Sequence, residues 1–225
     1  SNISRWIMST KHSKAAARFI GNRKQEAWHD ETLWMVRVKR DKMSHSLPEW
    51  ERLRELACDI KLYSNSHLDT LLEEFEKNAT ANGAIVHWAK DAAEHNAIVE
   101  EILQQHKAHT LIKSKSMLTE ECGMNDYLFG KGYDIIESDL GERILQWMKL
   151  HPSHIVMPAI HIKRQEVGEM MERVLGTEKG NSDPTYLTHA VQKNMRGKFL
   201  TADVAMTGAN FAVASTGEIV VCTNE

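Results

Sequence analysis

From residue 84 onward the sequence alternates short apolar runs with segments of helical periodicity, and this alternation constrains the fold more than any other feature. A short apolar run, a helical segment and another such run are typical of β–α–β units. The runs are nearly all apolar, as expected for strands that are covered on both faces. We therefore predict an α/β fold with a mostly parallel sheet covered by helices. The expected strands are 84–89, 110–113, 133–137, 154–160, 202–206, 211–214 and 218–223, and the expected helices are 91–103, 117–130, 141–150, 163–175 and 184–197.

The first 80 residues lack this alternation and show helical periodicity only. Apolar residues recur at helical spacing, with an interruption at Gly21, and the pattern changes after Asn82-Gly83. Aromatic side chains at such spacing are typical of packing residues, which here include Trp28, Trp34 and Trp50. We predict a helical arm (1–80) and an α/β domain (81–225), and we expect the arm to pack on that domain or on a partner.

Composition argues against several classes of protein. The net charge of -3 and the pI near 6.5 do not favour nucleic-acid binding, because neutralising phosphates requires clustered Lys and Arg. No window approaches the roughly 18–20 apolar residues of a membrane span, and we see no signal-peptide pattern, so we expect a cytoplasmic protein. Three widely spaced cysteines predict free thiols rather than a disulfide framework or a metal site: Cys58, Cys122 and Cys222.

Two turn segments near the end of the sequence combine small and hydroxyl residues: Thr207-Gly208-Ala209-Asn210 and Ser215-Thr216-Gly217. Turns of this kind expose main-chain N–H groups beside hydroxyls, which suits a carboxylate or a phosphate. Asp203 begins the stretch that contains them. The alternative is that they are tight turns within a buried sheet. We expect a small anionic ligand, with Asp203, Thr207, Gly208, Asn210, Thr216 and Gly217 as candidate binding residues.

Polar residues also follow three of the expected strands, where parallel α/β sheets bind their ligands. After strand 110–113, Lys113, Ser114 and Ser116 supply cationic and hydroxyl donors at a cleft edge, next to the start of a helix. The alternative is that Ser116 only caps that helix.

After strand 133–137, the residues Glu137, Asp139 and Glu142 are candidates for acid–base or binding work. The favoured alternative here is an ordinary helix cap by Asp139 with Glu142 three residues on. His161 follows strand 154–160 and is a candidate cleft residue, whereas its seven-residue spacing from His154 argues against a shared zinc ion. We find neither a P-loop nor a Gly-x-Gly-x-x-Gly or Gly-x-Ser-x-Gly motif.

Four of these segments together resemble the LUD domain family: 113–121 (KSKSMLTEE), 137–142 (ESDLGE), 152–161 (PSHIVMPAIH) and 202–225 (ADVAMTGANFAVASTGEIVVCTNE). The likeness runs from about Ala15 to the end. It implies a fold similar to the group of coenzyme A transferases, ribose-phosphate isomerases and glucosamine-phosphate deaminases. It also implies a role in oxidising L-lactate to pyruvate, with other subunits of an iron–sulfur complex as partners.

The resemblance implies 4Fe-4S clusters in full-length members, in a ferredoxin-like region that we expect this chain to lack. Cluster ligation requires closely spaced thiolates, so we expect neither a cluster nor any other metal or cofactor here, and no catalysis by this chain alone. Two alternatives stay open. One is a free-standing enzyme acting on acyl-coenzyme A or a sugar phosphate, with Glu121 or Glu137 as nucleophile or base. The other is a scaffold whose arm binds a partner.

Overall fold

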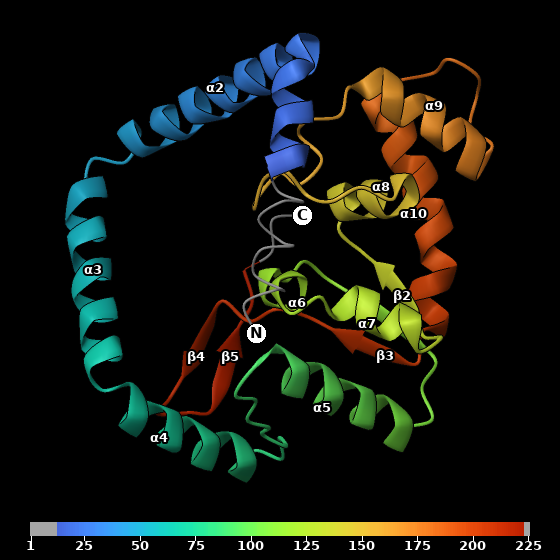
Figure 1. Cartoon of the computed structure of the whole chain (residues 1–225). Helices are drawn as coiled ribbons and strands as arrows, with labels where there is room; N and C mark the ends of the chain where they lie inside the picture. Colours follow the sequence, from blue (N-terminus) through green and yellow to red (C-terminus); the bar gives the residue numbers. More distant parts are fainter. Residues whose placement is uncertain (1–12, 223–225) are drawn as a thin grey trace.

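A computed structural model describes residues 13–222 of the chain (Figure 1). Its main sheet contains three parallel strands in the order β2-β1-β3. The strands are β1 (Thr110–Lys113), β2 (Asp134–Glu137) and β3 (Val204–Met206). The helices of this domain are α5 (Ala92–Gln105), α6 (Met117–Glu121), α7 (Met124–Gly130), α8 (Leu140–Met148), α9 (Arg164–Leu175) and α10 (Pro184–Thr201). The prediction of a parallel sheet covered by helices is confirmed.

The alternation of side chains along β1 and β2 divides the core into two clusters. Leu111 and Ile135 point to one face, where they pack with residues of α5 and α7 such as Leu103 and Leu128. Ile112 and Ile136 point to the other face, where α8, α9 and α10 supply Ile144, Met170, Met171, Leu187, Val191 and Met195. Because both faces are covered, the two middle residues of β1 and of β2 are all apolar.

The prediction of a strand is wrong for two segments. Residues 84–89 form irregular chain and pair with no strand of the described residues. Their side chains Ile85 and Trp88 are 83% and 53% exposed. Residues 154–160 form bends and turns. There, His154 Nδ1 accepts from the backbone N–H groups of Val156 and Met157, and Pro158 has no N–H to donate to a ladder.

The last two strands form a hairpin of their own, separate from the main sheet. β4 (Phe211–Val213) and β5 (Glu218–Val220) pair antiparallel, whereas segment 202–206 joins the main sheet as β3. The turn between β4 and β5 contains Gly217 at a φ of 72°. The end of the expected strand 218–223 lies outside the described residues.

One expected helix is divided into two. Residues 117–130 form α6 and α7, and Gly123 between them adopts a φ of 61° that interrupts the helical path. The other expected helices of the domain are present within a few residues of their predicted bounds. Among residues 13–222, no helix has the length and apolar character needed to cross a membrane.

The N-terminal region is helical, as predicted, and its described part contacts the α/β domain near its start and at its end. It consists of a helical segment over residues 13–21, α2 (Arg23–His45), α3 (Trp50–Ser66) and α4 (Leu68–Ala81). Near the start, Lys163 Nζ lies 5.5 Å from the ring centroid of Trp28. Figure 1 shows α3 standing apart from the domain, and none of its residues is buried. Residues 1–12 of the expected arm lie outside the described part.

The far end of the arm is fixed to the β4–β5 hairpin. Asn78 Nδ2 on α4 donates to the carbonyl oxygen of Ala214, and Asn82 Nδ2 donates to that of Thr216, each at 2.8 Å. A β-carbon on Gly217 would lie 2.2 Å from the backbone nitrogen of Ala79, so only glycine allows this approach. The arm therefore arches from the segment around Lys163 to the hairpin and contacts the α/β domain near both ends, while packing of α3 on a partner stays a prediction.

Candidate functional site

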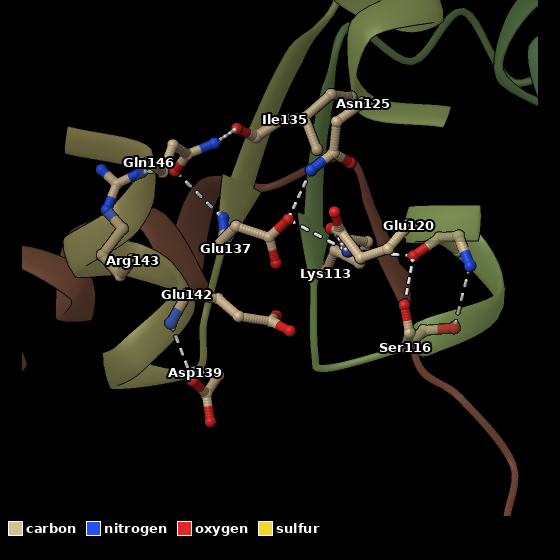
Figure 2. Close-up of polar contacts among 11 residues, drawn as sticks. Lys113, Ser116, Glu120, Asn125, Ile135, Glu137, Asp139, Glu142, Arg143 and Gln146 are labelled. Atoms are coloured by element: carbon tan, nitrogen blue, oxygen red, sulfur yellow. Dashed lines mark hydrogen bonds and ion pairs between the residues drawn. The ribbon is translucent and has the colours of Figure 1, made fainter. Parts of the chain in front are cut away.

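Lys113, the last residue of β1, lies in the interior with 0% of its surface exposed. Its partner across the parallel ladder is Glu137, the last residue of β2. Paired residues of adjacent strands project from the same face, and Lys113 Nζ lies 3.0 Å from Glu137 Oε1 (Figure 2). Nζ also donates to Thr119 Oγ1 at 3.0 Å and to Glu120 Oε1 at 3.4 Å. An ammonium group has three donors, so each has an acceptor within the protein.

This placement corrects the expectation that Lys113 lies at a cleft edge. Its charge is opposed by two carboxylates of the chain itself, Glu137 and Glu120, with side chains 3% and 28% exposed. Breaking a buried ion pair by removing one partner typically costs about 3–5 kcal/mol, because the other charge stays buried and unpaired. Lys113 is therefore part of the interior of the domain and stabilises the buried carboxylate of Glu137.

Side chains from α7 and α8 complete the surroundings of Glu137. Asn125 Nδ2 donates to Glu137 Oε1 at 2.6 Å. Since β2 lies at the edge of the sheet, its outer backbone groups have no neighbouring strand. Gln146 takes that place: its Nε2 donates to the carbonyl of Ile135 at 2.7 Å, and its Oε1 accepts from the N–H of Glu137 at 3.3 Å and from Arg143 Nη1.

Asp139 acts as the N-cap of α8, accepting from the N–H of Glu142 at 2.9 Å, which confirms the cap interpretation. Its other carboxylate oxygen lies 3.6 Å from Lys115 Nζ. Glu142 itself is only 6% exposed, and Figure 2 shows its carboxyl group directed from α8 toward Glu137 and Lys113. Burial, and next the negative charge of Glu137, raise the pKa of Glu142 to about 8. At pH 7 this carboxyl group is therefore mainly neutral.

Glu137 and Glu142 line a cavity of about 560 Å³ at the carboxyl end of β2. Its walls come from α6, α7, α8 and the segment that follows α8, and they include Glu120, Asn125, Phe129, Leu145, Lys149 and His151. Volumes of roughly 300–1,000 Å³ are usual for small-molecule sites. The position agrees with the rule that ligands bind beyond the carboxyl ends of parallel strands.

Ser114, Ser116, Thr207 and Gly208 lie together beyond β1 and β3. Ser114 Oγ donates to Thr207 Oγ1 at 2.8 Å, and a β-carbon on Gly208 would lie 3.2 Å from the carbonyl oxygen of Lys115. Ser116 caps α6 by accepting from the N–H of Thr119 at 3.4 Å, which confirms the alternative role considered for it. Gly208 has no positive φ, so close approach rather than backbone conformation favours glycine there.

The other candidate binding residues lie elsewhere. Asp203 is at the opposite end of the sheet, where its Oδ2 accepts from the N–H groups of His109 and Thr110, and these hydrogen bonds lower the pKa of its carboxyl group. Asn210 Oδ1 accepts from the N–H of Cys222 beside the hairpin. Thr216 and Gly217 form the turn that contacts α4.

Of the three catalytic candidates, only Glu137 belongs to the cluster around Lys113. Glu121 is exposed on α6. His161 lies 2.7 Å, through Nδ1, from Ser153 Oγ, and burial followed by the nearby charge of His29 lowers the pKa of its imidazole. On α6, the acid that contacts Lys113 is Glu120. Glu120 lies one position before Glu121 and therefore about 100° from it around the helix.

Sequence reasoning missed Glu120, Asn125 and Gln146, although all three belong to the cluster. The cap at Ser116 offered a signal for Glu120. It fixes where α6 begins, and hence which face of the helix turns toward the end of β1. Asn125 and Gln146 have no comparable signal, because polar residues on amphipathic helices more commonly face solvent.

The cysteines of the described region do not fit an iron–sulfur cluster. Cys58 lies on α3 and is exposed, Cys122 follows α6, and Cys222 follows β5. All three thiols are free. Within residues 13–222, no group of three or more His, Cys, Asp and Glu side chains is arranged to hold a metal ion. No step that involves such a cluster can therefore be assigned to these residues.

Comparison with known proteins shows which family the chain resembles. The family model of the LUD domain matches residues 72–225, which cover most of α4 and the whole α/β domain. Lactate utilization protein B of Bacillus pumilus (strain SAFR-032) is 42% identical over 184 residues, covering 81% of this chain and 38% of the relative. The proteins of the same name from Bacillus thuringiensis (strain Al Hakam) and Bacillus cereus (strain AH187) are 39% identical over 188 residues, covering 84% of this chain and 40% of each relative.

No solved structure matches the chain. The chain spans about two fifths of the length of these curated relatives. The matched region includes the buried Lys113–Glu137 pair and the cavity beside it. Since the family model covers more than half of the chain and agrees with the resemblance of its four segments, the chain belongs to the LUD domain family.

Proposed function

We propose that this chain is the LUD-domain portion of a protein that functions in lactate utilisation, as a subunit of an iron–sulfur complex that oxidises L-lactate to pyruvate. The single observation that carries the proposal is the 39–42% identity to proteins named lactate utilization protein B over more than four fifths of the chain. Electron transfer belongs to 4Fe-4S clusters outside residues 13–222, since the cysteines described above do not fit one. The α/β domain would contribute its cavity and its surfaces.

A chromosomal deletion tests this function. We would remove codons 72–225 in frame from the gene in the organism that encodes it, and measure growth with L-lactate or with pyruvate as sole carbon source. Loss of growth on L-lactate with normal growth on pyruvate is expected, because only the oxidation step would be absent. Restoration by the full-length gene is the control. Undiminished growth and undiminished lactate consumption by the deletion strain would contradict the proposal.

A docking role for the arm is a second candidate, and the exposed apolar side chains of α2 and α3 favour it. Trp34, Val38, Leu56 and Ile60 are 54–64% exposed. Contiguous exposed apolar surface usually marks an interaction site. If other subunits of the complex bind there, the double substitution Leu56→Ser and Ile60→Ser in the full-length protein should abolish their co-purification. The same double substitution should leave the cavity of the α/β domain unchanged, so retained co-purification would count against docking by α3.

A further inference from the structure

The cavity beside Glu137 and Glu142 contains buried oxygen atoms without hydrogen-bond partners. Glu137 Oε2, Glu142 Oε2 and Asn125 Oδ1 are buried, and none has a partner among the described residues. The two glutamates are 2% and 6% exposed, and both line the cavity. A buried polar atom left without a partner typically costs about 1–3 kcal/mol. Three such atoms at one cavity indicate a site made to receive hydrogen-bond donors.

The charges around these oxygens limit the kind of donor. Lys113 is shared between Glu137 and Glu120, at 3.0 Å and 3.4 Å, and a second cation, Lys149, lines the same cavity. A small anion would meet the carboxylates of Glu120, Glu137 and Asp126, and a small cation would meet Lys149, while the ammonium group of Lys113 is fully occupied. Charges of both signs on the wall therefore favour an uncharged ligand in this cavity.

A hydroxyl group matches these surroundings because it donates a hydrogen bond without adding a charge. It can donate to Asn125 Oδ1 or to the buried carboxyl oxygens of Glu137 and Glu142, which are close enough for their mutual hydrogen bond to raise the pKa of Glu142. Phe129, Leu145 and Leu150 line the remaining wall and would contact the carbon skeleton of such a ligand. Several hydroxyl groups on adjacent carbons would satisfy more than one of the buried oxygens at once.

We propose that this cavity is a binding site for a small uncharged polyol, held by Glu137, Glu142 and Asn125. The inference goes beyond lactate utilisation and does not depend on it, because it rests on the cavity and its buried oxygens alone. It assigns Glu137, Glu142 and Asn125 as hydrogen-bond acceptors for the hydroxyl groups of the ligand. No covalent step is involved.

Saturation-transfer NMR on the 225-residue chain tests the proposal, with D-ribose as the polyol probe. Acetate, methylammonium and magnesium chloride serve as competitors. We expect a saturation signal for D-ribose that none of the three competitors reduces. Absence of binding by D-ribose, or its displacement by methylammonium or magnesium, would overturn the proposal, the latter in favour of a cation site.

Variants locate the binding. Asn125→Ala and Glu142→Leu should each weaken D-ribose binding about tenfold, the change expected for one lost hydrogen bond of roughly 1.4 kcal/mol. Asn125 is partly exposed, so its variant remains informative if Glu142→Leu does not fold, as checked by circular dichroism. The matched control is Lys193→Ala, which lies at a second cavity of about 630 Å³ between α9 and α10 and should leave binding unchanged. Equal binding by Asn125→Ala and the unmodified chain, or weakened binding by Lys193→Ala alone, would refute the assignment.

Discussion

The arm and the α/β domain distribute their side chains in opposite ways. In α3 the apolar residues Leu53, Leu56 and Ile60 are 41–57% exposed, and no residue of the helix is buried. In the domain, the charged residues Lys113 and Glu137 are 0% and 2% exposed. Apolar character alone therefore does not place a residue in the interior, and charge alone does not place it at the surface.

The difference follows from what each region has to pack against. The helix α3 stands apart from the α/β domain, so no surface of that domain covers its apolar side chains. An apolar face can be buried only where another element packs against it. A residue at the end of a central strand is covered by its neighbours and must find partners in the interior, as Lys113 does in Thr119, Glu120 and Glu137. Burial in this protein is decided by tertiary neighbours.

The largest expected effect tests the buried charge. Lys113→Met in the 225-residue chain should lower the free energy of unfolding by about 3–5 kcal/mol, because Glu137 would stay buried without its counter-charge. Urea denaturation measures the change. The control is Lys193→Met at an exposed position, expected to shift stability by no more than about 0.5 kcal/mol. Similar small effects of both substitutions would show that Lys113 is not buried in solution.

A second prediction concerns the neutral acid in the same cluster. The pKa of Glu142 is about 8 in the folded chain, and its ordinary value is 4.5. Between these values the unfolded chain has lost the proton that the folded chain keeps, so stability falls as pH rises and levels off above about pH 8. The slope for one group is at most about 1.4 kcal/mol per pH unit and falls by half at pH 8, which gives about 2 kcal/mol between pH 6 and pH 8.

Glu142→Gln should remove most of this dependence, since a carboxamide does not titrate. Urea denaturation at several pH values compares the two proteins. Glu121→Gln is the matched control, because Glu121 is exposed on the neighbouring helix α6 and should leave the pH profile unchanged. An unmodified chain with flat stability from pH 6 to pH 8 would contradict the neutral state of Glu142.

A third prediction addresses the junction between arm and domain. Gly217→Ala should cost about 1–2 kcal/mol for the left-handed backbone, and roughly 1–3 kcal/mol more because the new β-carbon would displace the backbone of Ala79. The variant Gly180→Ala distinguishes the cost of the backbone conformation from the cost of the displaced neighbour. Gly180 has a similar φ of 73° but no atom within 4 Å of its β-carbon position.

Urea denaturation and limited proteolysis of the β4–β5 hairpin are the measurements for this pair. Gly217→Ala should expose the hairpin to protease, whereas Gly180→Ala should not. Equal costs and equal cleavage in the two variants would mean that α4 does not pack on the hairpin turn.

The smallest expected effect tests the exposed face of the arm. Ile60→Ala on α3 should change stability by no more than about 0.5 kcal/mol, because Ile60 is 57% exposed. Leu128→Ala in the core, at 0% exposure, should cost about 2–5 kcal/mol. Thermal denaturation at several protein concentrations gives both values. A cost above about 1 kcal/mol for Ile60→Ala that grows with concentration would show that α3 is covered by a second copy in solution.

Short sequence signals predicted correctly those features that depend on interactions between residues close in the chain. Ser116 and Asp139 each accept a hydrogen bond from the N–H three residues on, as predicted from their positions before a helix. The strands 110–113 and 133–137 are nearly as predicted, since continuous apolar runs between polar ends suit a sheet covered on both faces. Segments 84–89 and 154–160 share that apolar character and form no strand, because pairing depends on a neighbour that the segment itself does not supply.

In the candidate site, too, some features could be predicted from the sequence and others depend on residues distant in the chain. Its position beyond the carboxyl ends of the strands follows from the order of elements, and Glu137 and Glu142 were recognised there. Their roles were not, because the spacing of residues along a chain does not reveal which oxygens end up without a partner. The turn segments at Thr207 and Thr216 look alike in sequence, yet one lies beside Ser114 and the other on α4.

The sequence by itself determined most of the helices and their caps, the strands β1 and β2, and membership of the LUD domain family, since periodicity, capping and shared motifs all lie within short segments. Only the tertiary structure decided that Lys113 is buried, that Glu142 stays mainly neutral at pH 7 and that α3 exposes its apolar face. The physical reason is that burial, and the pKa shifts that follow from it, depend on atoms brought together from distant parts of the chain.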